Sequence, residues 1–172
     1  MKTSAYIVTL IGLAALMLLS ARLVAGGDEL PPADGEKFWH YITETDPYQQ
    51  WDMWPGHQGM VPGKSPHGAH LKIYANDIAI KAAERDEEKL PPGSILVKEN
   101  YAEDAETLKA VTPMYKIKGY NPDGGGWFWA KYGAAGKVMA AGKVGSCMDC
   151  HRSKQAQDWR FMPAGHQHGA HD

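Results

Sequence analysis

A five-residue segment near the C-terminal end constrains this chain more than any other feature. Residues 147–151, Cys-Met-Asp-Cys-His, form the pattern C-x-x-C-H, which is the attachment signature of c-type haem. Two thiols with two residues between them can each bond one vinyl group of a single porphyrin, and the histidine that follows then lies under the iron. The segment predicts one covalently attached haem c, with Cys147 and Cys150 as its anchors and His151 as the proximal iron ligand.

Three other interpretations of the two cysteines agree less well with the sequence. A thioredoxin-type redox pair belongs at the start of a helix in a βαβ unit, whereas this pair follows a glycine-rich strand region. A zinc site of Cys147, Cys150, His166 and His168 has one residue between its histidines, where zinc fingers have roughly three to five. A disulfide closed over two residues would be strained. The spacing therefore favours haem c.

The N-terminal segment predicts export from the cytoplasm. Lys2 is followed by an uncharged apolar run over residues 5–19, and small residues around Ala25 and Gly26 suit cleavage, so residues 1–25 are interpreted as a secretory signal peptide. The alternative is an uncleaved anchor, but Arg22 ends the apolar run just short of the roughly 20 residues that a membrane span needs. Haem c is also attached outside the cytoplasm. We therefore expect a periplasmic protein without membrane association after cleavage.

Charge and aromatic content narrow the classes of partner. The chain has 18 Lys and Arg against 20 Asp and Glu, evenly spread, so nothing indicates binding to nucleic acid or to an anionic membrane surface. Six Trp and eight Tyr are many for so short a chain. Aromatic side chains could form the wall around a flat apolar macrocycle, although ordinary core packing remains the default explanation.

The pattern of apolar residues predicts the fold class α+β, mainly an antiparallel β-sheet with a few helices and the C-x-x-C-H segment at its C-terminal end. Helical spacing of Phe38, Tyr41 and Ile42 predicts a helix over residues 35–48, followed by a Gly-, Pro- and His-rich loop. Asn76 is expected to cap a second helix over residues 78–85. Strands are predicted over residues 70–75, 94–101, 112–120, 127–132 and 137–144.

These elements divide the chain into four parts. After the signal peptide, residues 26–66 carry the N-terminal helix and the loop, and residues 67–162 form the haem-binding domain. Residues 163–172 contain three histidines among small polar residues without apolar periodicity, which predicts a disordered tail.

Several segments carry a more specific signal through their order and spacing. They are residues 91–99 (PPGSILVKE), 114–120 (MYKIKGY), 126–129 (GWFW), 147–151 (CMDCH) and 158–161 (DWRF). This combination resembles the cytochrome P-460 family and its β-sheet relatives, the cytochromes c′-beta, over roughly residues 67–161. The resemblance implies a small, mostly antiparallel, periplasmic monohaem protein that often forms homodimers. The activities it implies are hydroxylamine oxidation, handling of nitric oxide, and gas binding at a five-coordinate iron.

The resemblance also implies roles for single residues besides the C-x-x-C-H segment. Lys98 stands at the lysine that is covalently joined to the porphyrin in the P-460 members proper, and His70 matches a position on the distal side of the pocket. The hydroxylamine-oxidising members carry a distal carboxylate on the strand that corresponds to residues 112–118, where this chain has Met114. Without that base, proton removal from a substrate on the iron would lack its partner.

The orientation of Lys98 follows from strand alternation. Residues 95–97 are apolar on both faces of their strand, so both faces are expected to be covered, and Lys98 and Glu99 then point to opposite faces. If Lys98 faces the haem, desolvation favours its neutral form, which is a nucleophile. The alternative is a lysine at the strand end that reaches water and forms a surface ion pair.

Two classes of function remain open. The first is a haem oxidoreductase that turns over a small nitrogen compound, hydroxylamine or nitric oxide, at an open iron position and exchanges electrons with a partner cytochrome. The second is a non-catalytic cytochrome that carries electrons or binds a gas, with a Met or His as sixth ligand. The spin state of the ferric iron distinguishes an open position from an occupied one.

Overall fold

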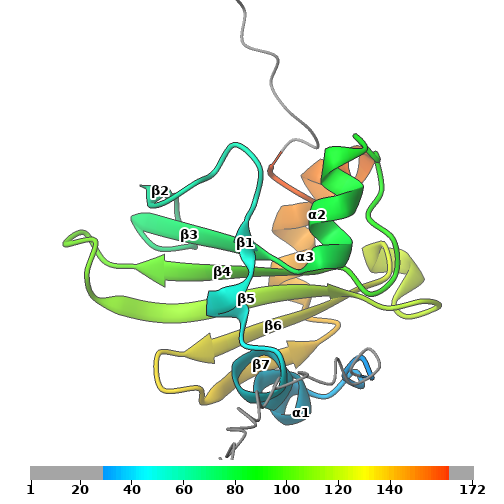
Figure 1. The fold of residues 1–172 in the computed structure, drawn as a ribbon. Coiled ribbons are helices and arrows are strands. Elements are labelled where there is room, and N and C mark those ends of the chain that lie inside the picture. Colours follow the sequence, from blue (N-terminus) through cyan, green and yellow to red (C-terminus); the bar gives the residue numbers. More distant parts are fainter. Residues whose placement is uncertain (1–28, 163–172) are drawn as a thin grey trace, which may run out of the picture.

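One antiparallel sheet organises residues 29–162, the part of the chain that the computed structural model describes (Figure 1). The predicted signal peptide and tail lie outside these residues. The strands are β1 (Asp52–Met53), β2 (Val61–Pro62), β3 (His70–Ala75), β4 (Ile95–Tyr101), β5 (Leu108–Lys116), β6 (Trp127–Gly133) and β7 (Val138–Gly142). Their order is β1-β3-β4-β5-β6-β7, with β2 also paired to β3. The long strands are therefore neighbours in chain order, which is a meander.

Short helices lie at the ends and faces of this sheet. They are α1 (Gly35–His40), α2 (Asp77–Glu84) and α3 (Gly145–His151), with 3-10 turns at Tyr48–Gln50, Pro122–Gly124 and Arg152–Gln157. α1 packs against β7, and α2 packs against β3 and β4 (Figure 1). None of the described helices is long and apolar enough to cross a membrane.

The two faces of the sheet carry separate cores because side chains alternate along each strand. On β4, Leu96 belongs to a core shared with α2 and α3, whereas Ile95 and Val97 belong to a core shared with the N-terminal helical segment. The second core is built around Phe38, which stacks on Tyr115 at a centroid distance of 5.4 Å. Both faces of β4 are therefore covered, as its apolar sequence predicts.

The predicted fold class is confirmed, and several elements differ from those predicted. The short strands β1 and β2 lie within the segment predicted as a loop. The helix predicted over residues 35–48 ends as an α-helix at His40 and continues as a π-helical turn, Tyr41–Thr45. Pro47 explains the end of this segment, because the residue before a proline is disfavoured in the α region. The strand predicted over residues 112–120 instead spans Leu108–Lys116, since a turn begins at Ile117 and passes through Gly119 at φ +73°.

Asn76 shows how one polar side chain fixes the start of α2. It is 6% exposed, and its Oδ1 accepts hydrogen bonds from the backbone N–H groups of Ala79 and Ile95. Its Nδ2 donates to the carbonyl of Gly93 at 2.9 Å. The predicted cap is present, and it also joins the helix to the first residue of β4.

Candidate haem site

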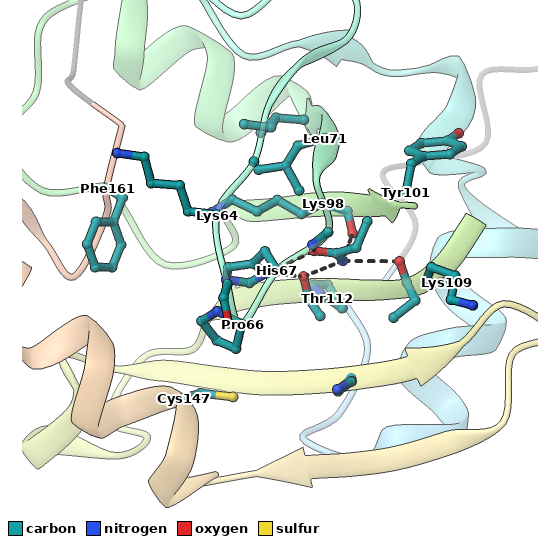
Figure 2. A pocket seen from close by; sticks show the side chains of 18 of the residues that line it. Lys64, Pro66, His67, Leu71, Lys98, Tyr101, Lys109, Thr112, Cys147 and Phe161 are labelled. Atoms are coloured by element: carbon teal, nitrogen blue, oxygen red, sulfur yellow. Dashed lines mark hydrogen bonds between the residues drawn. The ribbon is translucent and has the colours of Figure 1, made fainter. Parts of the chain in front are cut away.

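A cavity of about 1020 Å³ lies on the side of the sheet that faces α3. Its walls come from β3 to β6, from the loop between β2 and β3, and from α3 and the segment that follows it. The apolar side chains lining it include Leu71, Ile73, Leu96, Met114, Trp129 and Phe161. Figure 2 shows Lys98 and Thr112 on neighbouring strands, with His67 in front of them and Cys147 on the helix at the opposite wall.

Helix α3 presents the two thiols of the C-x-x-C-H segment. Cys147 and Cys150 are one helical turn apart, so their side chains lie on the same face of the helix, and both line the cavity. Both are free thiols; Cys147 is half-buried and Cys150 is exposed. Burial raises the pKa of the Cys147 thiol. Two uncrosslinked thiols on one cavity wall are what attachment to two vinyl groups requires.

His151 ends α3 and is held in one tautomer. Its Nδ1 lies 2.6 Å from the carbonyl oxygen of Trp159, and because a carbonyl only accepts, Nδ1 carries the proton and the lone pair is on Nε2. Burial lowers the pKa of His151 to about 4, so the ring is neutral at pH 7. Trp129 and Phe161 pack on it with ring centroids 4.6 and 5.0 Å away. A neutral, oriented imidazole is the form that binds iron.

The carbonyl that orients His151 is fixed by a buried network around Asp158. Asp158 and Trp159 both have positive φ, +55° and +65°, which turns the chain sharply after the 3-10 segment. The Asp158 carboxylate accepts a hydrogen bond from the backbone N–H of Leu90 at 2.9 Å and forms an ion pair with Lys116. The Asp158 carbonyl accepts from the indole N–H of Trp127. The segment after the haem-attachment motif is thereby joined to the sheet.

Lys98 lines the cavity, and Glu99 points to the other face of the sheet. Lys98 is 8% exposed, and burial lowers its pKa to about 8. Glu99 accepts hydrogen bonds from the hydroxyls of Tyr48 at 2.9 Å and Tyr101 at 2.7 Å. The opposite orientation of the two side chains is as strand alternation predicts. A bond between Lys98 and a porphyrin stays a prediction.

Two distal candidates from the sequence occupy different places. Met114 is 6% exposed and lines the cavity, whereas His70 is half-buried and is not among the lining residues. His67, three residues earlier, does line the cavity. The sequence placed His67 in a loop rich in Gly, Pro and His without assigning it a role. The one feature of the sequence that could have indicated His67 is its place between Pro66 and Gly68. Proline restricts the backbone, and glycine permits conformations that other residues rarely adopt.

The residues present suit a haem by charge and by polar groups as well as by shape. Four lysines line the cavity against one acidic residue, Glu103, which is exposed. A surplus of cations favours the two carboxylates of a porphyrin. Trp129 also lines the cavity, and its buried indole Nε1 has no hydrogen-bond partner among the described residues. A haem held here supplies one-electron redox chemistry and a binding position for small ligands.

Fold and site together define a small β-sheet cytochrome with its C-x-x-C-H segment on the helix that follows the sheet. The family model of cytochrome P460 matches residues 45–162. The match covers more than half of the chain, so the protein belongs to the cytochrome P460 family and is a haem- and iron-binding cytochrome of the c type. No curated protein matches the chain.

Proposed function

We propose that this chain is a periplasmic cytochrome that carries a single haem c and passes electrons to or from a partner cytochrome or binds a small nitrogenous gas. The observation that carries the proposal is the wall formed by Cys147, Cys150 and His151 on one apolar cavity. The thiols anchor the haem, and the Nε2 lone pair of His151 binds its iron. The predicted signal peptide supports the proposal, because c-type haem is attached outside the cytoplasm, where such electron partners also occur.

The residues around His151 suit reversible electron transfer. Trp129 and Phe161 pack against the ring, and the Trp159 carbonyl holds Nδ1–H, so the ligand keeps one orientation in both oxidation states. The apolar side chains that line the cavity limit the access of water to the iron. Burial and hydrogen bonding of the axial ligand are the features by which a protein sets a haem potential.

Conversion of hydroxylamine or nitric oxide is the second candidate, and the oxidation of hydroxylamine needs a proton acceptor close to the substrate. Among residues 29–162, Glu103 is the only carboxylate that lines the cavity, and it is exposed. His67 is the other candidate acceptor, since burial lowers its pKa to about 4 and leaves it neutral at pH 7. A base with so low a pKa has little driving force for taking a proton. The cavity therefore favours electron transfer or gas binding over hydroxylamine oxidation.

Mass analysis of the full chain, expressed with the c-type maturation machinery, tests the haem assignment. We expect one haem that acid and organic solvent do not extract, on the peptide that contains residues 147–150. The double variant Cys147→Ala/Cys150→Ala should lose covalent haem, whereas His151→Ala should keep the haem but change its absorption spectrum. Solvent-resistant haem at the wild-type level in the double variant would overturn the assignment.

Activity and peptide assays separate the remaining alternatives. Reversible reduction without steady turnover of hydroxylamine or nitric oxide is expected for an electron carrier or a gas-binding protein, and sustained turnover would favour the enzyme. Lys98 is tested in the same digest. Haem mass on the peptide that contains Lys98 as well as on residues 147–150 would establish the porphyrin bond, and haem on residues 147–150 alone would exclude it.

A further inference from the structure

Two histidines from distant parts of the chain line the same cavity, and the space between their rings would hold one metal ion. The ring centroids of His67 and His151 are 6.3 Å apart, with the ring planes at 83°. His67 belongs to the loop between β2 and β3, and His151 ends α3. Two imidazoles on opposite sides of one metal ion have ring centres roughly 6 Å apart, because each metal–nitrogen bond is about 2 Å long and each ring centre lies about 1 Å behind its nitrogen. The observed spacing matches this arrangement.

The amide of Asn100 fixes the tautomer of His67. Asn100 is 3% exposed, and its Nδ2 donates to the carbonyls of Lys98 at 3.1 Å and Ala110 at 3.0 Å. Its Oδ1 is therefore the atom that meets Nδ1 of His67 at 2.9 Å. An amide oxygen only accepts, so Nδ1 of His67 carries the proton and Nε2 carries the lone pair. His67 thus has the same tautomer as His151, and each ring has its second nitrogen held by a fixed acceptor, as metal-binding histidines do.

Close backbone packing keeps His67 in this position. A Cβ atom on Gly68 would lie 2.3 Å from the carbonyl oxygen of Tyr101, and a Cβ atom on Gly63 would lie 2.0 Å from the carbonyl oxygen of Gly68. Both contacts are with backbone, which cannot move aside, so glycine is required at both sites. The loop therefore lies directly on the end of β4 and presents His67 to the cavity.

We propose that Nε2 of His67 is the sixth ligand of the haem iron, opposite His151, so that the resting ferric protein is six-coordinate with two histidines. The proposal rests on the haem assignment made above. It specifies how the site works, because an external ligand must displace His67 before it reaches the iron. Apparent affinity for such a ligand is then reduced by the fraction of molecules in which His67 has left. This favours electron transfer over turnover at an open iron.

Spectroscopy of the wild-type full chain in its haem-loaded form tests the ligand without any mutation. Low-spin electron paramagnetic resonance signals of the ferric protein, with a near-infrared magnetic circular dichroism band typical of two imidazoles, are expected. A high-spin ferric spectrum, or a band typical of histidine–methionine or histidine–amine ligation, would overturn the proposal. The latter two would assign the position to Met114 or Lys98, which also line the cavity.

Matched variants provide a second and independent test. His67→Ala should convert the ferric iron to the high-spin form, and added imidazole should restore the low-spin spectrum. His40→Ala, at an exposed histidine of α1, should leave the spectrum unchanged. A low-spin spectrum in His67→Ala without imidazole, or a conversion to high spin in His70→Ala, would overturn the assignment of His67.

The haem content of each sample separates this proposal from the one on which it rests. Mass analysis of residues 147–150 is made on the same material. Covalent haem with a high-spin wild-type spectrum overturns the sixth ligand alone, whereas loss of covalent haem in the wild-type chain overturns the haem assignment itself. If His67→Ala does not fold, the wild-type spectra decide the question.

Discussion

Removing the carboxylate of Asp158 should be among the most damaging single changes in this protein. Asp158 is 2% exposed, and its carboxylate satisfies both the ammonium of Lys116 and the backbone N–H of Leu90. Breaking a buried ion pair by removing one partner costs about 3–5 kcal/mol, because the remaining charge stays desolvated. We therefore expect Asp158→Ala to lower the free energy of unfolding by about 3–5 kcal/mol. Asp158→Asn keeps an acceptor for Leu90 and should lose about 1–3 kcal/mol.

Urea unfolding followed by tryptophan fluorescence measures these losses on the haem-loaded chain. Asp77→Ala is the matched control, because Asp77 forms an exposed ion pair with Lys81 on α2, and such pairs contribute about 0.5 kcal/mol. The haem spectrum gives a second readout. Since Asp158 precedes Trp159, whose carbonyl orients His151, Asp158→Ala should also shift the absorption bands. A loss as small as that of Asp77→Ala, with an unchanged spectrum, would refute the reasoning.

Three further predictions concern other parts of the chain. Met114→Glu puts a carboxylate into the apolar cavity and should raise hydroxylamine oxidation above the wild-type rate in steady-state assays; no gain, in a protein whose wild type already turns over hydroxylamine, would mean that Met114 does not stand where the base belongs. Burial and the charge of Glu99 raise the pKa of Tyr74 from 10.0 to about 12, so its stabilising contribution is present below pH 10 and lost between pH 10 and 12. Urea midpoints should fall more over that window for the wild type than for Tyr74→Phe. Deleting residues 165–172, which lie outside the described residues, should leave the haem spectrum unchanged.

Features that depend on neighbours in the chain were predictable from the sequence. The alternation on β4 correctly placed Lys98 and Glu99 on opposite faces, and Asn76 caps α2 as expected. Both features follow from local rules. Side chains alternate between the two faces of a strand, and the free N–H groups at the start of a helix need a hydrogen-bond acceptor. The early start of β5 at Leu108 was missed, because its first residues pair with β4 across a register shift near Tyr101. The pattern of apolar residues in the sequence does not indicate such a register shift.

The orientation of His67 depends on tertiary contacts, and that is why the sequence assigned this residue no role. Its orientation depends on Asn100, which lies 33 residues away in sequence and reaches it only once β3 and β4 have paired. The resemblance to the family implied that His70 lies on the distal side of the pocket, but the alternation of side chains along β3 gives the opposite placement. Leu71 and Ile73 line the cavity, so the two-residue period directs the side chain of His70 away from it. The histidine at the start of β3 therefore faces away from the cavity, whereas His67, in the preceding loop, lines it.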